Sequence, residues 1–148
     1  MSIHNNLRDL LVEMGSKGID SKGERYFSRS YTGDSEPLDI RRGKKSTEWN
    51  PDIIWIRNGK TFITEIALSE NWRSIVGEFT LAKISDAWGI LFISDFDYEY
   101  LSDLLSILGQ SLNYKKWYFY HVEDLKNPRK IAKEVVDWLK KEKFTGWK

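Results

Sequence analysis

The sequence predicts a single α/β domain in which helices flank a mixed β-sheet. Three observations support this fold class. Apolar residues at helical spacing alternate with short β-rich runs along the chain. Two such runs, 53–57 and 61–68, are separated by Asn58-Gly59, a dipeptide typical of a two-residue hairpin turn. The continuous apolar run 88–94 is typical of a strand covered on both faces, and 148 residues suffice for one domain core.

Four segments have the apolar spacing of amphipathic helices. They span residues 5–14, 69–85, 98–112 and 127–143. Ser69, Asp97 and Asn127 are the expected N-caps of the last three, because their side chains can accept a hydrogen bond from the first helical turn. Further strands are expected at 38–40 and 117–122, whereas residues 15–35 resemble neither element. The helices and strands are therefore expected to alternate over most of the chain.

The predicted hairpin places two carboxylates side by side. A two-residue turn at Asn58-Gly59 puts Ile54 opposite Ile63 and Asp52 opposite Glu65, all on one face of the ribbon. Opposed like charges are destabilising, and a divalent cation held between the carboxylates would compensate. In the alternative interpretation, Asp52 merely begins the strand and Glu65 is solvated, but a carboxylate without a partner does not belong on an apolar face.

The order Pro51-Asp52, hairpin, Glu65-Ile66-Ala67 resembles the PD-(D/E)xK nuclease superfamily. The resemblance covers about residues 7–122 and implies a restriction-endonuclease-like αβββαβ core, here with an extra C-terminal strand and helix. It also implies that Mg²⁺, with Mn²⁺ as a substitute, is held by Asp52, Glu65 and the backbone carbonyl of Ile66. The implied activity is hydrolysis of DNA phosphodiester bonds.

One position departs from the resembled motif, because Ala67 stands where the superfamily has a lysine. Lys83, in the predicted second helix, projects close to the direction of Trp72 and is the first candidate to replace the missing cation in catalysis. The alternative is that Lys83 only extends its charge over the rim of the core. Glu78 lies at the edge of the same helical stripe and is expected to assist with metal or water.

The composition excludes several kinds of functional site. The chain has no cysteine, and its two histidines, His4 and His121, have no second ligand at zinc-binding spacing, so neither disulfides nor a zinc site are expected. No phosphate-binding glycine loop or serine triad occurs, and no small-molecule organic cofactor is expected. The N-terminal residues lack the pattern of a signal peptide, and no apolar run is long enough to span a bilayer. A cytoplasmic location is expected.

These observations predict a metal-dependent endonuclease whose cleavage of DNA is structure-specific or weakly sequence-specific. A homodimer is the candidate assembly. The alternative is a nuclease-fold module that binds nucleic acid or another partner without turnover, which the loss of the motif lysine would permit. A purely structural α/β domain would explain the hairpin but not the opposed acids.

A basic cluster precedes the hairpin and is the candidate nucleic-acid contact. It consists of Arg41, Arg42, Lys44 and Lys45, which surround Gly43. Because the net charge of the whole chain is only +1, attraction to phosphates must come from such local clustering. The alternative interpretation is a solvated cationic turn.

Neutralising all four basic residues should weaken binding to every DNA sequence alike, because interactions with phosphates carry little sequence information. The plot of log K against log salt concentration should flatten by about 0.9 for each phosphate that the variant no longer neutralises on duplex DNA. Titrations of labelled duplexes at several salt concentrations measure this slope. A slope identical to that of the parent protein would exclude the cluster from the binding surface.

Overall fold

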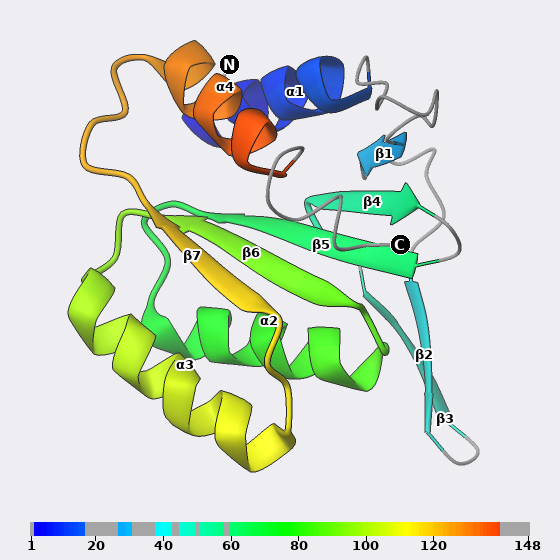
Figure 1. Cartoon of the computed structure of the whole chain (residues 1–148). Helices are drawn as coiled ribbons and strands as arrows, with labels where there is room; N and C mark the ends of the chain where they lie inside the picture. The colour runs from blue at the N-terminus through cyan, green and yellow to red at the C-terminus, as the bar shows by residue number, and fades with distance from the viewer. Residues whose placement is uncertain are drawn as a thin grey trace.

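The computed structural model describes residues 2–16, 27–30, 38–42, 45–49, 51–57 and 60–139, and side chains within 2–15, 51–55 and 61–139. Helices and strands alternate through most of this part of the chain (Figure 1). In order, the elements are α1 (Ile3–Ser16), β1 (Phe27–Ser30), β2 (Leu38–Arg42), β3 (Lys45–Trp49), β4 (Ile53–Arg57), β5 (Lys60–Ala67), α2 (Trp72–Ile84), β6 (Gly89–Ser94), α3 (Tyr98–Leu112), β7 (Trp117–His121) and α4 (Pro128–Trp138).

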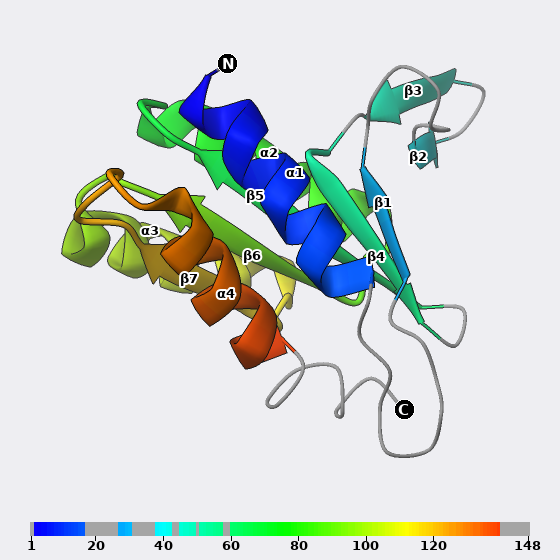
Figure 2. The same ribbon diagram turned by 90° about the horizontal axis from the view of Figure 1, so that it is seen from above.

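The main sheet is mixed and has the strand order β1-β4-β5-β6-β7. The strands β1, β4 and β5 are antiparallel neighbours, whereas β5, β6 and β7 run parallel. Helices α1 and α4 cover one face of this sheet, and α2 and α3 cover the other (Figures 1 and 2). The predicted α/β class with a helix-flanked mixed sheet is therefore confirmed.

The first strand of the main sheet is not the one that the sequence indicated. Residues 38–40 do form a strand, but they belong to β2, which pairs only with β3 in a separate two-stranded hairpin. The main sheet begins with β1, in a segment whose sequence predicts neither helix nor strand. Its residues pair with β4 from Phe27 opposite Ile56 to Ser30 opposite Ile53. Four residues give too little alternation for a strand to be recognised.

Two of the three predicted helix caps are confirmed. Asp97 accepts a hydrogen bond from the Tyr100 N–H at 2.9 Å, and Asn127 accepts one from the Lys130 N–H. The predicted Ser69 cap is wrong, because α2 begins later and is capped by Asn71. Ser69 instead occupies the left-handed region, with φ of 59°. The last helix is predicted to reach residue 143, and its final residues lie outside the described part of the chain.

The core has two layers, one on each face of the sheet. Along β5, Phe62 and Ile66 point toward α1 and α4, whereas Ile63 and Ala67 point toward α2 and α3. This alternation follows from the twofold period of side chains along a strand. All six residues of β6 are buried, as expected of a strand covered on both faces. None of the described helices combines the length and the apolar character needed to cross a bilayer.

Alanine should have opposite effects on stability at Gly89, which is closely packed in β6, and at Gly77, which faces open space in α2. A Cβ at Gly89 would lie 2.8 Å from the Phe62 ring and 2.9 Å from the Lys116 carbonyl oxygen, so Gly89→Ala should lower the free energy of unfolding by about 1–3 kcal/mol. The matched control is Gly77→Ala in α2, where a Cβ has no such neighbour within 4 Å. Alanine there should raise the free energy of unfolding by about 0.5–1 kcal/mol. Urea denaturation of both variants measures the two changes, and equal effects would contradict the packing of β6.

Candidate active site

The pairing of β4 with β5 has the register that the sequence predicted. Arg57 lies opposite Lys60, Ile54 opposite Ile63, and Ile53 opposite Thr64. Asn58 and Gly59, the predicted turn residues, lie outside the described part of the chain. The next position along the two strands joins Asp52, at the start of β4, to Glu65, in the second half of β5. The register therefore brings the two predicted acids to the same place.

Two hydrogen bonds connect Asp52 and Glu65 with the opposite backbone. The Asp52 N–H donates to Glu65 Oε1 at 3.0 Å, and the Ile66 N–H donates to Asp52 Oδ2 at 2.8 Å. Because the N–H and C=O groups of one strand residue point to the same side, the Ile66 carbonyl also faces the Asp52 side of β5. The three residues that the resemblance assigns to metal binding are thus neighbours.

Glu65 is a buried acid, with 5% of its surface exposed. Burial raises its pKa well above the ordinary value, and the nearby charges of Asp52 and Glu78 raise it further, while the hydrogen bond from the Asp52 N–H acts in the opposite direction. Ionising Glu65 therefore costs free energy mainly because the carboxylate is buried, and the negative charges of Asp52 and Glu78 add to that cost.

Two further glutamates, Glu70 and Glu78, extend the site. Glu70 lies between β5 and α2, and Glu78 lies within α2. Burial, followed by the charges of Glu70 and Asp52, raises the pKa of Glu78 to about 8. Burial and the charge of Asp52 also raise the pKa of Glu70. Together, Asp52, Glu65, Glu70 and Glu78 form an acidic cluster in which each glutamate ionises less readily than in water.

Helix α1 borders the acidic cluster on its other side. His4 Nε2 lies 3.0 Å from Asp52 Oδ1, and this hydrogen bond is the main cause that raises the pKa of His4. Arg8 lies one helical turn beyond His4, on the same side of α1. Its Nε is buried without a hydrogen-bond partner and lies 3.6 Å from Asp9 Oδ1. Groups from both helical layers therefore meet at the start of β4.

The cluster contains carboxylate oxygens whose hydrogen-bonding capacity is unused. Glu70 Oε2 and Glu78 Oε2 are buried and have no hydrogen-bond partner. Buried acceptors of this kind usually have a partner, which can be an ion or a water molecule. Within the described part of the chain, however, no three acidic or histidine side chains are arranged to hold a metal ion as they stand. The oxygens of Asp52 are engaged instead by His4 and by the Ile66 N–H.

The candidate cation Lys83 lies on a different side of α2 from Glu78. The two residues are five positions apart, which corresponds to about 140° around a helix. The buried stripe of α2, Ile75, Phe79 and Ala82, runs between them. Lys83 is half-buried at the end of the helix, and Trp72, which shares its direction, is 37% exposed. Lys83 therefore flanks the core instead of pointing into it with the apolar stripe.

The predicted nucleic-acid contacts lie on the separate hairpin. Arg41 and Arg42 end β2, opposite Ser46 and Lys45 of β3. Lys44 lies outside the described residues, and the side chains of the other three are not among those described. Arg41, Arg42 and Lys45 are thus placed at one end of the β2–β3 pair, and the contact of the basic cluster with DNA stays a prediction.

Two members of the site, His4 and Glu70, are not among the candidates that the sequence indicates, and neither is Arg8, which lies beside His4 on α1. His4 has no second ligand at zinc-binding spacing, so the sequence treats it as isolated. His4 and Arg8 do carry a weak signal, since their i, i+4 spacing places two polar groups beside each other on α1. Glu70 carries no signal, because only the turn between β5 and α2 brings it to the acidic cluster.

The pKa of Glu78 predicts that the metal-free protein loses stability as the pH rises. The unfolded chain releases this proton near the ordinary pKa of 4.5, whereas the folded protein keeps it until about pH 8. The free energy of unfolding should therefore fall between these pH values, by up to about 5 kcal/mol. Glu78→Gln, which cannot ionise, should make that fall shallower.

Urea denaturation at several pH values in the presence of a chelator measures this dependence. Glu99→Gln, the same chemical change at an exposed site of α3, is the matched control and should retain the slope of the parent protein. Equal slopes for the parent protein and Glu78→Gln would contradict the raised pKa of Glu78.

Comparison with protein-family models, with curated proteins and with solved structures finds no match for this chain. The site is therefore interpreted from its own geometry. Its main features are two acids paired across an antiparallel register, two further half-buried glutamates with raised pKa values, and the His4 imidazole of α1.

Proposed function

We propose that this protein is a metal-dependent endonuclease that hydrolyses DNA phosphodiester bonds and has a restriction-endonuclease-like fold. The order of elements supports the proposed fold. Along the main sheet, α1 is followed by three antiparallel strands, β1, β4 and β5, then by α2 and the parallel strand β6. This is the αβββαβ order that the resemblance implies. The strand β7 and helix α4 extend it at the C-terminal side.

The observation that carries the proposed activity is the pairing of Asp52 with Glu65. Both side chains accept hydrogen bonds from the opposite backbone, so their positions are defined before any ligand binds. The resembled motif has its metal-binding acids at these two positions. Electrostatic preorganisation of this kind is what a site for a cation and a phosphate requires.

A divalent cation fits the chemistry of the acidic cluster. Carboxylate and carbonyl oxygens are the ligands that Mg²⁺ and Mn²⁺ prefer. Asp52, Glu65 and the Ile66 carbonyl would hold the ion, and the unpartnered oxygens of Glu70 and Glu78 would complete the polar surroundings. When bound there, the ion supplies polarisation of the scissile phosphate and a lowered pKa of a coordinated water.

The remaining steps belong to side chains of the protein. Glu78, with a pKa of about 8, is mostly protonated near neutral pH and can donate that proton as a general acid. Before Asp52 can direct Oδ1 toward a cation, its hydrogen bond with His4 must break. The displaced His4 then lies on the α1 side of the site, where it can attract the phosphate, and the charge of Arg8 lies beside His4 on the same helix.

Two residues are candidates for the catalytic cation that the motif lysine would otherwise supply. Ala67, at the position of the motif lysine, is fully buried among apolar residues. Lys83 remains the replacement that the sequence indicates, and it would have to reach around α2 from the flank opposite Glu78. Arg8 is the alternative, because its buried Nε has no hydrogen-bond partner.

The second candidate function is a nuclease-fold module that binds without turnover. The complete burial of Ala67 favours it, because no substitution in that position could supply a solvated cation without disturbing the core. The acidic cluster would then be retained for binding a cation or a partner. The two functions differ in whether a metal ion activates cleavage.

Glu65→Gln should abolish DNA cleavage and leave DNA binding nearly unchanged, because it removes a ligand charge while preserving side-chain volume. The metal-free variant should be at least as stable as the parent protein, since the buried repulsion with Asp52 is relieved. Addition of Mg²⁺ should stabilise the parent protein more than the variant. Nicking of plasmid, cleavage of branched DNA with Mg²⁺ or Mn²⁺, and thermal melts with and without metal measure these effects.

Three further variants sharpen this test. Glu99→Gln, on the exposed surface of α3, is the matched control and should cleave like the parent protein. Lys83→Ala and Arg8→Ala test the two candidate sources of the catalytic cation. Substitution of the residue that supplies this cation should reduce turnover and leave DNA binding unchanged. A well-folded parent protein that cleaves none of these substrates and shows no metal-dependent shift in melting would reject the enzyme in favour of the binding module.

A further inference from the structure

The strand β7 forms one end of the main sheet, and β6 separates it from β5, which carries Glu65. It pairs with β6 on one side, and no strand among the described residues pairs with its other edge. Its sequence, WYFYH, contains no Lys, Arg, Asp, Glu, proline or glycine. An uncovered edge strand of this composition is a template for pairing with another strand. Proteins usually cover or interrupt such an edge.

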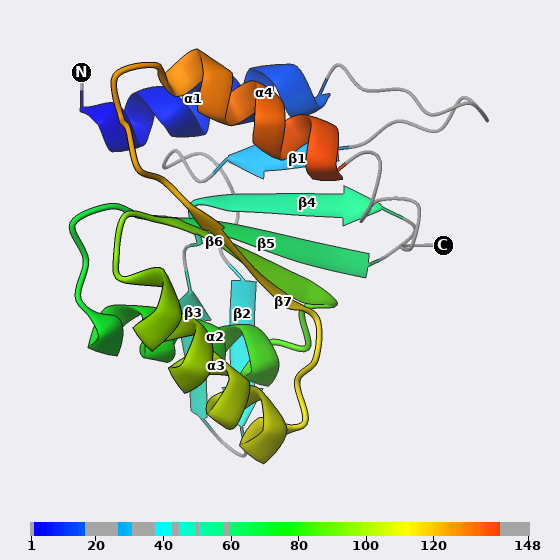
Figure 3. The ribbon, with the colours of Figure 1, turned by 60° about the vertical axis from the view of Figure 1, so that its left-hand side comes forward.

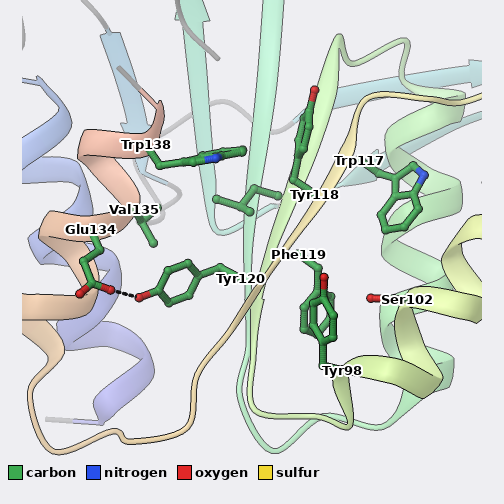
Figure 4. Close-up of a pocket in the computed structure, with 10 residues that line it drawn as sticks. Tyr98, Ser102, Trp117, Tyr118, Phe119, Tyr120, Glu134, Val135 and Trp138 are labelled. Atoms are coloured by element: carbon green, nitrogen blue, oxygen red, sulfur yellow. Dashed lines mark hydrogen bonds between the residues drawn. The ribbon is translucent and has the colours of Figure 1, made fainter. Parts of the chain in front are cut away.

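A groove of about 580 Å³ is lined mainly by residues of β7, α3 and α4. Figure 3 shows β7 at the edge of the sheet, between the layer of α1 and α4 and the layer of α2 and α3. Phe119 and Tyr98 of α3 form the wall on one side of the sheet, with ring centroids 5.4 Å apart. Tyr118 and Trp138 of α4 form the wall on the other side, with centroids 5.1 Å apart. Figure 4 shows these side chains and the hydrogen bond from the Tyr120 hydroxyl to Glu134. The groove thus exposes the strand edge together with aromatic surface on both faces.

Backbone hydrogen bonds at the two ends of β7 show which groups of this edge face outward. The Lys116 carbonyl accepts from the Ile90 N–H at 3.0 Å, and the Val122 N–H donates to the Ser94 carbonyl at 2.9 Å, so both residues face β6. The direction of backbone groups alternates along a strand. Trp117, Phe119 and His121 therefore direct their N–H and C=O groups to the open edge.

The charged residues that flank β7 would pair with their opposites in an antiparallel second copy of the strand. Exposed Lys115 precedes the strand, and exposed Glu123 follows it at the same distance from Phe119. An antiparallel copy centred on Phe119 would place each Lys115 opposite the Glu123 of its partner. Because a twofold interface uses the same patch twice, this contact would occur two times.

We propose that the β7 edge binds a second copy of this chain, in an antiparallel pairing centred on Phe119 that joins the two main sheets. In this register Trp117 lies opposite His121 and Tyr118 opposite Tyr120, each on a common face of the joined sheet. The residues that direct their backbone outward are also those that this register pairs through hydrogen bonds. The outward backbone groups, the aromatic surface and the flanking charges are therefore all compatible with the same antiparallel pairing centred on Phe119.

Charge reversal at the two flanking residues tests the register. Lys115→Glu and Glu123→Lys should each weaken the dimer on the order of 10-fold, because each places like charges opposite one another at two symmetric positions. The double variant, Lys115→Glu with Glu123→Lys, exchanges the charges and should restore the affinity of the parent protein. Both residues are exposed, so folding is not at risk.

Analytical ultracentrifugation over a range of protein concentrations measures these affinities for the full chain. Lys126→Glu, at an exposed site beyond the register, is the control and should leave the dimer unchanged. A parent protein that stays monomeric throughout would overturn the proposal. A dimer that responds to neither single reversal would equally overturn it, because the contact surface would then lie elsewhere.

Backbone amide exchange gives an independent readout that does not depend on a variant. When the protein concentration rises through the dissociation constant, exchange at Trp117, Phe119 and His121 should slow by on the order of 10-fold or more, because these N–H groups become bonded to the partner. Tyr118 and Tyr120, which face β6, should change much less. Uniform behaviour of all five amides would contradict the antiparallel strand pairing.

Discussion

The antiparallel register of β4 and β5 brings Asp52 beside Glu65, and the rest of the acidic cluster is arranged around that pair. A shift of one residue would turn Glu65 to the opposite face of the sheet, where α1 and α4 pack. The two hydrogen bonds between the acids and the opposite backbone reinforce the register, because they engage groups beyond the last paired residues of β4. A local rule of strand pairing thus determines the position of the candidate metal site.

The acidic cluster opposes folding unless its charge is compensated. Removing an ion from water costs several kcal/mol even after the surroundings relax. Glu65 and Glu78 respond by retaining protons, as their raised pKa values indicate. Strongly shifted acids that gather at one point are more frequent at functional sites than elsewhere. The cluster therefore has the properties of a site at which stability is sacrificed for binding or catalysis.

The two helical layers contribute different chemistry to the cluster. From one layer, α1 brings His4, and from the other, α2 brings Glu78, so a basic and an acidic group approach Asp52 from opposite sides of the sheet. The edge strand β7, which β6 separates from β5, carries aromatic side chains instead. This separation allows contact with a second protein chain at β7 without covering the acidic cluster.

The sequence by itself determined the α/β class, the register of β4 and β5, and the caps Asp97 and Asn127, because each depends on neighbouring residues or on strand alternation. The tertiary structure decided which strand begins the main sheet, since β1 is too short to have a recognisable pattern. It also decided that His4 reaches Asp52 and that Glu70 and Glu78 join the same cluster. Those contacts depend on how α1 and α2 pack against the sheet, and no spacing within one element encodes the distance between two elements.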